Sequence, residues 1–312
     1  MNYEKWLKEY GGDLTGKRVA VTGATGSIGR ELCRFLGGLG AELILACRNP
    51  VRAEEFRKSL EEEGIHADVL VLDVSSRSSI DGFCQSVAER YGRLDVLFHN
   101  AGIYHLPRTE NEDGLEIHFA TNFWGPCYLT RRILPLMRDG KVVLMSSIAF
   151  RFYKLDLEDL QSRGCKSSTK VYGRAKRLLM LGAAQLQEEA AAYGVKVALA
   201  HPGISPTEML SSKKGFSRAF QALIVPLMKL IFLSPKKASL AGVLAVCGDA
   251  PEGSWAGPRS FGIWGKPAFR PVRRNFTEAE LRFPVETLYR VGQTQSWEAK
   301  VTESFSEKHM KS

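Results

Sequence analysis

The stretch TGATGSIG, residues 22–29, lies between a short apolar run and a segment with helical periodicity. Its glycines Gly23, Gly26 and Gly29 recur at every third position. Glycines at the junction of a strand and a helix let the backbone turn sharply and approach a pyrophosphate, which the free N–H groups of the helix then bind. Because the stretch directly follows the first predicted strand, it indicates a dinucleotide site rather than an ordinary tight turn.

Beyond this stretch, short apolar runs alternate with helical patterns over most of the chain. Continuous apolar runs are typical of strands covered on both faces, and strand–helix alternation indicates a parallel sheet with right-handed crossovers. We therefore predict an α/β fold, a Rossmann-like doubly wound parallel sheet of about seven strands with helices on both faces. The predicted strands are Arg18–Thr22, Glu42–Ala46, Asp68–Leu72, Val96–His99, Lys141–Met145, Lys196–Ala200 and Ser260–Trp264. The predicted helices are Arg30–Leu39, Arg52–Glu63, Ser79–Tyr91, Asp113–Met137 and Tyr172–Tyr193.

The composition is that of an ordinary globular protein, with 312 residues, 44% of them hydrophobic and 25% charged. These values exclude a disordered chain, a collagen-like repeat and a helical membrane protein. The six cysteines are scattered, without a CxxC pair or a Cys/His cluster at zinc spacing, so we expect buried thiols and no metal site. The polar residues 1–13 lack the apolar core of a signal peptide, and we expect a cytoplasmic protein.

The end of the second predicted strand indicates which dinucleotide is preferred. A carboxylate about 20 residues past the glycines would hold the ribose diol of NAD(H). Here the segment reads ACRN, residues 46–49, and Arg30 is a second nearby cation. A guanidinium can bind a 2′-phosphate through two hydrogen bonds, so Arg48 favours NADP(H) over NAD(H). A solvated loop arginine is the alternative interpretation.

Two further strand ends contribute to the expected cleft. Asp73 and Val74 follow the third predicted strand, where the carboxylate can either accept from an adenine amino group or cap the next helix. Both interpretations stay open. Asn100, Ala101 and Gly102 follow the fourth predicted strand, where small residues let the backbone line the adenosine side of the cleft.

Tyr172 and Lys176 are four positions apart, which places a phenol and an ammonium on one face of a predicted helix. This spacing is common by chance, but the pair follows the fifth predicted strand, which ends in Ser146 and Ser147 at the edge where α/β sheets bind ligands. Hydride transfer at a carbonyl needs a proton donor and acceptor at the oxygen. A neighbouring ammonium lowers the pKa of a phenol from about 10 toward a useful range, and a serine hydroxyl stabilises the developing oxyanion.

Taken together, these motifs resemble those of the short-chain dehydrogenase/reductase family over residues 14–264. The segments Leu45–Asn49, Asp113–Asn122 and Gly257–Arg259 are similar to its retinol dehydrogenase-like branch, which includes the WW-domain-containing oxidoreductases. The resemblance implies an NADP(H)-dependent oxidoreductase that interconverts an alcohol and a carbonyl by hydride transfer. It also implies a small hydrophobic substrate, such as a retinoid, steroid, lipid aldehyde or quinone-like compound.

The resemblance assigns a role to each matching residue. Tyr172 would act as general acid/base, while Lys176 lowers its pKa and binds the nicotinamide ribose. Ser147 would orient the substrate oxygen, and Asn122 would support a proton relay. The implied cofactor-binding residues are Gly23, Thr25, Gly26, Ser27, Ile28, Gly29, Arg48, Asp73, Val74, Asn100, Ala101, Gly102, Tyr172, Lys176, Pro202, Gly203, Ile204 and Thr207.

Two features depart from the family pattern. Ser27 stands where the middle glycine is usual, so that the spacing resembles the extended branch of epimerases and dehydratases. Ser147 and Tyr172 are 25 positions apart, a longer gap than usual, and residues 150–170 are expected to form a loop over the substrate. Because Ser146 is adjacent it is the alternative serine, and we prefer Ser147.

We expect one Rossmann-like domain over residues 1–265, with a substrate lid at 204–240 and a C-terminal extension over 266–312 that is partly surface or frayed. Residues 211–237 carry six basic side chains, no acidic one and an apolar run. A membrane-surface helix and a homo-oligomer contact are the alternatives to a lid for this segment. We assign the net charge of +9 to a phosphorylated cofactor and this segment, and expect no nucleic-acid partner.

Two other functions stay open. One is a regulatory protein that binds NADP(H) with little turnover, which the intact set of Asn122, Ser147, Tyr172 and Lys176 disfavours. The other is an extended-type epimerase or dehydratase, which the glycine spacing allows. The segments HPG at 201–203 and TNFWG at 121–125 disfavour that function.

Overall fold

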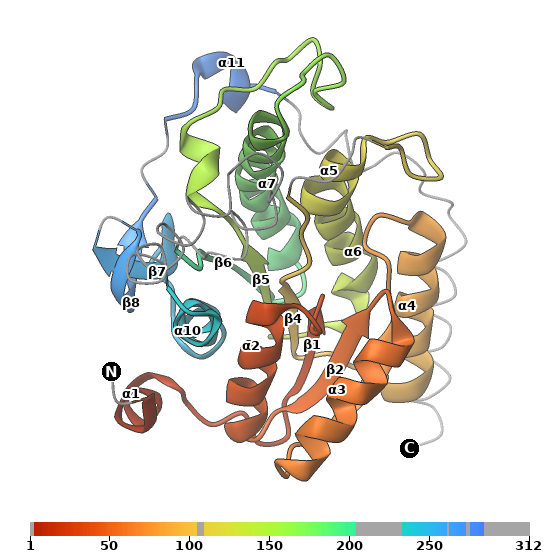
Figure 1. Ribbon diagram of the computed structural model, residues 1–312, viewed down its shortest axis with the longest axis vertical. Helices are drawn as coiled ribbons and strands as arrows, with labels where there is room; N and C mark the ends of the chain where they lie inside the picture. The colour runs from red at the N-terminus through yellow and green to blue at the C-terminus, as the bar shows by residue number, and fades with distance from the viewer. Residues whose placement is uncertain (1–2, 105–108, 204–232, 261, 273–274, 284–312) are drawn as a thin grey trace, which may run out of the picture.

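The computed structural model describes residues 3–104, 109–203, 233–260, 262–272 and 275–283. Within these residues, eight strands form one sheet with helices on both faces (Figure 1). The strand order is β3-β2-β1-β4-β5-β6-β7-β8, and all neighbours are parallel except β7 and β8. The strands are β1 (Arg18–Thr22), β2 (Glu42–Cys47), β3 (Ala67–Val71), β4 (Val96–His99), β5 (Lys141–Met145), β6 (Lys196–Ala200), β7 (Ser254–Ser260) and β8 (Trp264–Pro271). The predicted α/β fold is confirmed, with eight strands rather than about seven.

Two groups of helices cover the two faces of the sheet and bury separate apolar clusters against it. The first group is α1 (Tyr3–Tyr10), α2 (Ser27–Gly38), α3 (Pro50–Glu62) and α10 (Pro235–Cys247). The second group is α4 (Arg77–Tyr91), α5 (Ile117–Phe119), α6 (Gly125–Ile133) and α7 (Ser168–Ala191). The short helix α11 (Glu278–Leu281) lies beyond the sheet, at the same end of the molecule as the loop that precedes α7 (Figure 1).

The direction in which the chain adds successive strands to the sheet reverses between β1 and β4. The chain proceeds outward from β1 to β3, returns to place β4 on the other side of β1, and then continues outward through β5 and β6. In open α/β sheets the crevice at the carboxyl ends of the strands on either side of such a reversal binds ligands. The fold therefore places a candidate site between the chain segments that leave β1 and β4.

The predicted strand Ser260–Trp264 is wrong. Ser260 ends β7 and Trp264 begins β8, and the two residues pair across the turn of an antiparallel hairpin. Pro258 and Pro267 lie opposite each other in this hairpin, and Gly265 has a φ of 93°. Proline and glycine weaken the pattern of a strand but are tolerated at a sheet edge, which is why these two strands had no clear apolar signature.

The predicted helix Asp113–Met137 is also different, because it is shorter and broken. It begins at α5, widens into a π-helical turn (η1, Ala120–Trp124), continues as α6 and ends in a 3₁₀ turn (η2, Leu134–Leu136). Pro126 has no N–H to donate to the carbonyl of Asn122. The N–H of the preceding Gly125 bonds the carbonyl of Ala120, five positions back, which widens the turn. Widened turns of this kind are frequent at functional sites, and Asn122 lies within this one.

Within the described residues, three helices were not predicted from the sequence patterns: α1, α10 and the short α11. In α10 every residue from Ala238 to Val246 is buried, so the helix has little of the one-sided periodicity that identifies an amphipathic helix. Gly242 lies at its centre, where a Cβ atom would lie 2.9 Å from the Phe98 ring of β4. A helix that is apolar on all sides is difficult to distinguish from a buried strand by sequence alone.

Gly125 allows α6 to pack against the segment that follows β3. A Cβ at Gly125 would lie 1.7 Å from the carbonyl oxygen of Val74. We expect Gly125→Ala to lower the free energy of unfolding by roughly 3 kcal/mol, because the packed backbone cannot move away without strain. Urea unfolding measures this difference.

Gly82→Ala is the matched control, because no atom of the described residues lies within 4 Å of the added Cβ on α4. Helix propensity predicts a gain of about 1 kcal/mol for that variant. Equal unfolding midpoints for the two variants would contradict the close approach at Gly125.

Candidate active site

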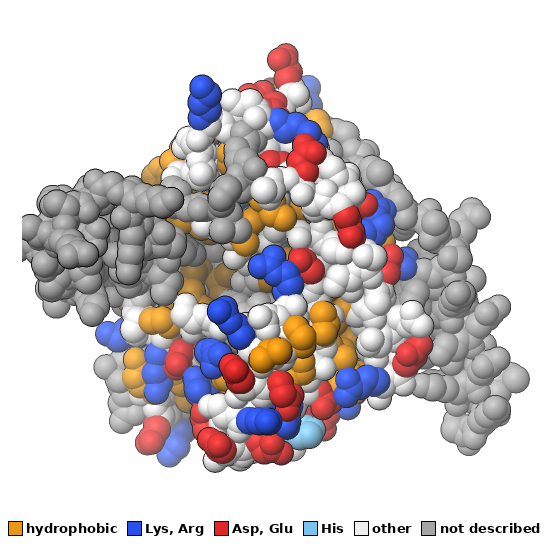
Figure 2. Space-filling model, turned by 45° about the vertical axis from the view of Figure 1, so that its right-hand side comes forward, with side chains coloured by type: hydrophobic (Ala, Val, Ile, Leu, Met, Phe, Trp, Pro, Cys, Tyr) orange, Lys and Arg blue, Asp and Glu red, His pale blue; other side chains and the backbone are white. Residues whose placement is uncertain are grey.

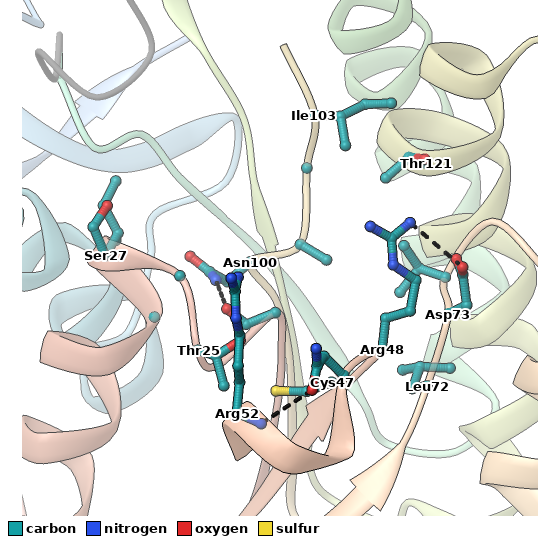
Figure 3. Close-up of a pocket in the computed structure, with 18 of the residues that line it drawn as sticks. Thr25, Ser27, Cys47, Arg48, Arg52, Leu72, Asp73, Asn100, Ile103 and Thr121 are labelled. Carbon is teal, nitrogen blue, oxygen red and sulfur yellow. Dashed lines mark hydrogen bonds and ion pairs between the residues drawn. The ribbon is translucent and has the colours of Figure 1, made fainter. Parts of the chain in front are cut away.

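A cleft of about 400 Å³ lies at the carboxyl ends of β1 to β4, where the sheet reverses direction (Figure 3). This volume is within the range of small-molecule sites. The predicted cofactor residues in its lining are Gly23, Thr25, Gly26, Ser27, Ile28, Gly29, Arg48, Asp73, Val74, Asn100, Ala101 and Gly102. The further lining residues are Cys47, Asn49, Arg52, Leu72, Ile103, Ile117 and Thr121.

The glycine turn is packed so closely that side chains are excluded from it. Gly23 has a φ of 62°, a conformation that favours glycine. A Cβ at Gly29 would lie 2.6 Å from the Gly23 carbonyl oxygen and 2.8 Å from Nδ2 of Asn100. Gly26 is the N-cap of α2, and none of the described side chains caps this helix end. The first-turn N–H groups of α2 are therefore oriented as in an anion site.

Arg48 and Asp73 face each other across the cleft, as Figure 3 shows. Nη1 of Arg48 is 3.7 Å from Oδ2 of Asp73, and the Arg48 side chain is 74% exposed. The other carboxylate oxygen of Asp73 accepts hydrogen bonds from the backbone N–H and the hydroxyl of Ser75, at 2.9 and 2.6 Å. Ser76, rather than Asp73, is the N-cap of α4. Asp73 therefore stabilises the turn before the helix and leaves one oxygen in the cleft.

A different arginine from the expected one accompanies Arg48. Arg30 donates from Nε to a backbone carbonyl, and its guanidinium lies 4.6 Å from the centre of the Phe56 ring. Arg52, on the first turn of α3, lines the cleft together with Arg48 (Figure 3). Arg48 from the β2–α3 connection and Arg52 from the first turn of α3 thus both line the site.

Gly102 lies between the cleft and the predicted catalytic residues. A Cβ at this position would lie 2.9 Å from Oδ1 of Asn122 and 3.8 Å from Nζ of Lys176. The buried amide of Asn122 also holds the backbone of Ile103, accepting from its N–H at 3.1 Å and donating to its carbonyl at 3.0 Å. The chain that leaves β4 is therefore fixed directly against Asn122 and Lys176.

Tyr172 and Lys176 are both buried on α7. Nζ of Lys176 donates to the carbonyl of Met145 at 2.9 Å and lies 5.9 Å from the centre of the Tyr172 ring. Tyr104 packs edge-on against Tyr172, with the ring centroids 4.9 Å apart. The last residue of β5 therefore positions the ammonium, and an aromatic ring positions the phenol.

Ser146 and Ser147 at the end of β5 have different partners. The Ser146 hydroxyl is buried and donates to the sulfur of Met180 at 3.0 Å. Ser147 is the N-cap of a 3₁₀ turn (η3, Ile148–Arg151), and its hydroxyl accepts from the Ala149 N–H at 3.3 Å. A hydroxyl that accepts this bond can still donate to a substrate oxygen.

The Pro-Gly segment follows β6, and Pro202 and Gly203 are both buried. Gly203 has a φ of 80°, and a Cβ there would lie 2.8 Å from Cδ1 of Leu233. The backbone at this position therefore requires glycine. Residues 204–232 lie outside the described part of the chain. They include the predicted cofactor residues Ile204 and Thr207, most of the predicted lid and most of the basic segment 211–237.

Two buried histidines lie near the predicted catalytic residues. Burial lowers the pKa of His201 to about 4. Burial, together with the charge of Lys176, lowers the pKa of His99 to about 3, and its Nε2 is 2.9 Å from Oγ1 of Thr130. Both rings are therefore neutral at neutral pH, whereas the ammonium of Lys176 lies 5.9 Å from the centre of the Tyr172 ring.

The lining residues that sequence reasoning missed come mainly from the segments around α3 and α5. Asn49 and Pro50 occupy the N-cap and first positions of α3, a combination typical of a helix start. This signal, directly after β2, places the first turn of α3 and Arg52 at the cleft. Ile103 and Thr121 lie near the two ends of the connection from β4 to α5. The position of this connection depends on tertiary contacts, so no local sequence motif identifies the two residues.

A doubly wound sheet with a glycine turn after β1 and a Tyr/Lys pair on the helix after β5 is the architecture of a short-chain dehydrogenase. The family model for short chain dehydrogenases matches residues 17–216, and the chain belongs to this family. It is an oxidoreductase of a family that binds nicotinamide cofactors and acts on small alcohols and carbonyls.

Among curated relatives, retinol dehydrogenase 14 of Mus musculus is 32% identical over 265 residues, which span 78% of this chain and 78% of that protein. Polyprenol dehydrogenase of Mus musculus is 33% identical over 249 residues, 76% of this chain and 73% of that protein. A crystal structure of an uncharacterized protein from Mycobacterium paratuberculosis has a TM-score of 0.67 and 28% identity, and covers 84% of this chain and 87% of that one. The predicted family and its retinol dehydrogenase-like branch are confirmed.

Two kinds of feature are absent from the described ranges. Within them, no helix combines the length and the apolar composition needed to cross a bilayer. The same residues contain no group of three or more His, Cys, Asp or Glu side chains arranged to hold a metal ion. On the described part of the face in Figure 2, Lys and Arg side chains lie beside Asp and Glu side chains.

The tight packing at Gly29 makes it a sensitive test of the cleft. We expect Gly29→Ala to weaken binding of NADPH at least 10-fold, because the added methyl group displaces the Gly23 carbonyl or the Asn100 amide. Gly38→Ala, at the other end of α2, meets no atom within 4 Å in the described part of the chain and is expected to bind like the wild type. Nicotinamide fluorescence measures both affinities, and equal affinities for the two variants would contradict this assignment of the cleft.

Proposed function

We propose that this protein is an NADP(H)-dependent oxidoreductase that interconverts an alcohol and a carbonyl on a hydrophobic substrate. The observation that supports it most strongly is the position of Gly102. Its backbone lines the cleft on one side and lies against Asn122 and Lys176 on the other. A dinucleotide in the cleft would therefore extend toward the Tyr172 phenol, where proton transfer is needed.

Tyr172 is the proposed general acid/base. When bound, the nicotinamide cofactor supplies or accepts the hydride. The Tyr172 hydroxyl gives a proton to the substrate oxygen in the reduction, and its phenolate takes the proton from the alcohol in the oxidation. The ammonium of Lys176, 5.9 Å from the ring centre, favours the phenolate. Ser147 donates a second hydrogen bond to the same oxygen and stabilises charge that develops there.

Lys176 and Asn122 have supporting roles in this proposal. Lys176 also binds the nicotinamide ribose, and its bond to the Met145 carbonyl fixes the side chain in one direction. Asn122 supports the proton relay, and its two bonds to Ile103 hold the amide in a single orientation.

NADP(H) is the proposed cofactor, with Arg48 and Arg52 as ligands of the 2′-phosphate. Both line the cleft, and the exposed side chain of Arg48 can reorient. Its ion pair with Asp73 is long, at 3.7 Å, so a doubly charged phosphate group competes well with this single carboxylate. Asp73 would then be left to accept from the adenine amino group.

A hydrophobic alcohol or carbonyl is the proposed substrate. The relatives named above are retinol and polyprenol dehydrogenases, and their names refer to long apolar alcohols. One aromatic ring packs against the Tyr172 phenol, that of Tyr104. A second, that of Tyr153, lies against the next residue of α7, where a Cβ at Gly173 would be 2.2 Å away. Membrane contact through residues 211–237 and formation of a homo-oligomer stay predictions.

The cofactor preference is tested by titration with NADPH and NADH, followed by nicotinamide fluorescence. We expect tighter binding of NADPH, and a loss of roughly 30- to 100-fold for Arg48→Asp, because charge-assisted hydrogen bonds to the phosphate are replaced by repulsion. Arg52→Gln is expected to weaken NADPH binding about 10-fold. Neither substitution should change NADH binding by more than about 3-fold.

Arg57→Gln is the control for this titration, because Arg57 lies further along α3 and is paired with Glu54 and Glu61. Wild-type protein that binds NADH as tightly as NADPH would refute the proposed preference. Protein that binds neither would remove the enzyme proposal altogether.

The role of Tyr172 is tested with NADPH and a panel of aldehydes and ketones. We expect Tyr172→Phe to lower kcat by roughly 10²- to 10⁴-fold, the range typical of general acid/base groups, while the affinity for NADPH stays nearly unchanged. Tyr104→Phe preserves the ring contact and is expected to keep kcat within a few-fold of wild type. Full activity of Tyr172→Phe would show that another group transfers the proton.

A further inference from the structure

Arg177 follows Lys176 on α7, its guanidinium is fully buried, and all five of its N–H donors have acceptors. Nε and Nη2 bind the two carboxylate oxygens of Glu280 at 2.6 and 2.7 Å. Nη1 donates to the Phe150 carbonyl at 2.9 Å and to Oδ1 of Asn275 at 3.1 Å, while Nη2 also donates to the Asn275 carbonyl at 2.8 Å. Arg177 therefore connects α7 with two segments that are distant in sequence.

Glu280 completes the same network from the C-terminal side. Its side chain is 2% exposed, and it accepts from the N–H of Leu155 at 2.8 Å and from the N–H of Thr277 at 2.7 Å. Burial alone would raise the pKa of Glu280, but the hydrogen bonds from Arg177 and from these backbone groups lower it to about 2. The carboxylate is therefore charged at all physiological pH values.

The network holds the turn that begins at Ser147. This turn, η3, ends at Arg151, and its Phe150 and Arg151 carbonyls accept from Arg177 and from Nδ2 of Asn275. The Phe150 ring also stacks against Phe276, with the centroids 6.0 Å apart. Residues 275–283 are thus fixed to the segment that carries the proposed substrate-orienting serine.

The same guanidinium is adjacent in sequence to Lys176. Arg177 lies one position after the lysine that contacts the Tyr172 ring, on the same buried stretch of α7. One side chain therefore fixes α7, which carries the phenol and the ammonium, to η3, which carries the hydroxyl. The carboxylate in this network lies well beyond residue 216, where the match to the family model ends.

Stability alone is a weak explanation for such a pair. Burial of two charges is costly, and replacement of a buried ion pair by apolar side chains is often neutral or stabilising. The planar guanidinium of Arg177, with its five hydrogen bonds, does however fix the relative position of the segments that it joins. The buried pair is better suited to fixing geometry than to adding stability.

We propose that Glu280 is a positioning residue: through Arg177, residues 275–283 set the distance between Ser147 and the Tyr172–Lys176 pair. The proposal rests on the function proposed above for these three residues. Small displacements of positioned groups reduce catalytic rates strongly, whereas the cofactor cleft at β1 to β4 is formed by other residues. The pair should therefore affect kcat more than cofactor binding.

The decisive variant is Arg177→Met/Glu280→Leu in the full-length protein, because it removes the network without leaving an unpaired buried charge. We expect its unfolding midpoint to stay within a few degrees of wild type and its NADPH affinity to change by less than about 3-fold. Activity is measured with NADPH and either all-trans-retinal or a long-chain aliphatic aldehyde. We expect kcat to fall roughly 10- to 100-fold, and the amides of residues 148–155 to exchange hydrogen faster. A wild-type kcat in this folded variant would overturn the proposal.

Two single variants keep the test valid if the double variant does not fold. Glu280→Asp retains the charge but shortens the reach, and we expect a kcat between those of wild type and Glu280→Gln. Glu278→Gln is the matched control on α11, because Glu278 pairs with Arg282 and both side chains are 77% exposed. A decrease in unfolding temperature for Glu280→Gln with unchanged kcat would reduce the network to a stabilising contact and contradict positioning.

The exchange measurement separates this proposal from the proposed function. If wild-type protein binds NADPH but reduces no aldehyde or ketone, the function fails, and exchange at residues 148–155 still decides the positioning. Faster exchange there in Glu280→Gln than in Glu278→Gln, with the rest of α7 unchanged, supports the network as a positioning device. Equal exchange in the two variants refutes it.

Discussion

The hydrogen bonds between Thr22 and Asn100 join the carboxyl ends of β1 and β4, and the geometry of the cleft depends on them. Oγ1 of Thr22 accepts from the N–H groups of Asn100 and Ala101, both at 3.0 Å, and Nδ2 of Asn100 donates to the carbonyls of Thr22 and Gly23. Because the sheet reverses at this point, the two chains leave in different directions and would otherwise separate. The bonds bring the glycine turn so close to β4 that only glycine fits at position 29.

Burial of three cations on one helix imposes a second constraint. Arg174, Lys176 and Arg177 are at most 8% exposed on α7, and buried charges must be hydrogen-bonded. The acceptors come from outside the helix. Arg174 donates to the carbonyl of Lys154 and the hydroxyl of Ser162, both in the long segment between β5 and α7. The unusual length of this segment therefore serves the burial of α7.

The strands at the centre of the sheet could be predicted almost to the residue, because buried parallel strands are continuous apolar runs. The observed limits of β1, β4, β5 and β6 are those expected from the sequence. The hairpin of β7 and β8 could not be predicted, since its prolines and glycines are tolerated only because it lies at the sheet edge. The local sequence likewise lacks the information for the broken helix around Asn122, which depends on contacts with the β3–α4 and β4–α5 connections.

A similar limit applies to the candidate site. The residues that follow each strand directly were identified, because their place at the sheet edge follows from topology alone. Arg52, Ile103 and Thr121 were not, since they reach the cleft through the first turn of α3 and through the contacts of Asn122. The partner of Arg177 was also hidden, because Glu280 lies 103 positions away in a segment without a motif.

The adjacent cations Lys176 and Arg177 differ in the acceptors that hold them, and the difference has an electrostatic consequence. Arg177 is paired with the carboxylate of Glu280, which cancels its charge. Lys176 donates to the neutral carbonyl of Met145, which fixes the direction of the side chain but leaves the positive charge of the ammonium in place. His99 and His201 are held neutral by burial. In the proposed function, Lys176 is thus an oriented positive charge close to the Tyr172 phenol, whereas the charge of its neighbour Arg177 is balanced by Glu280.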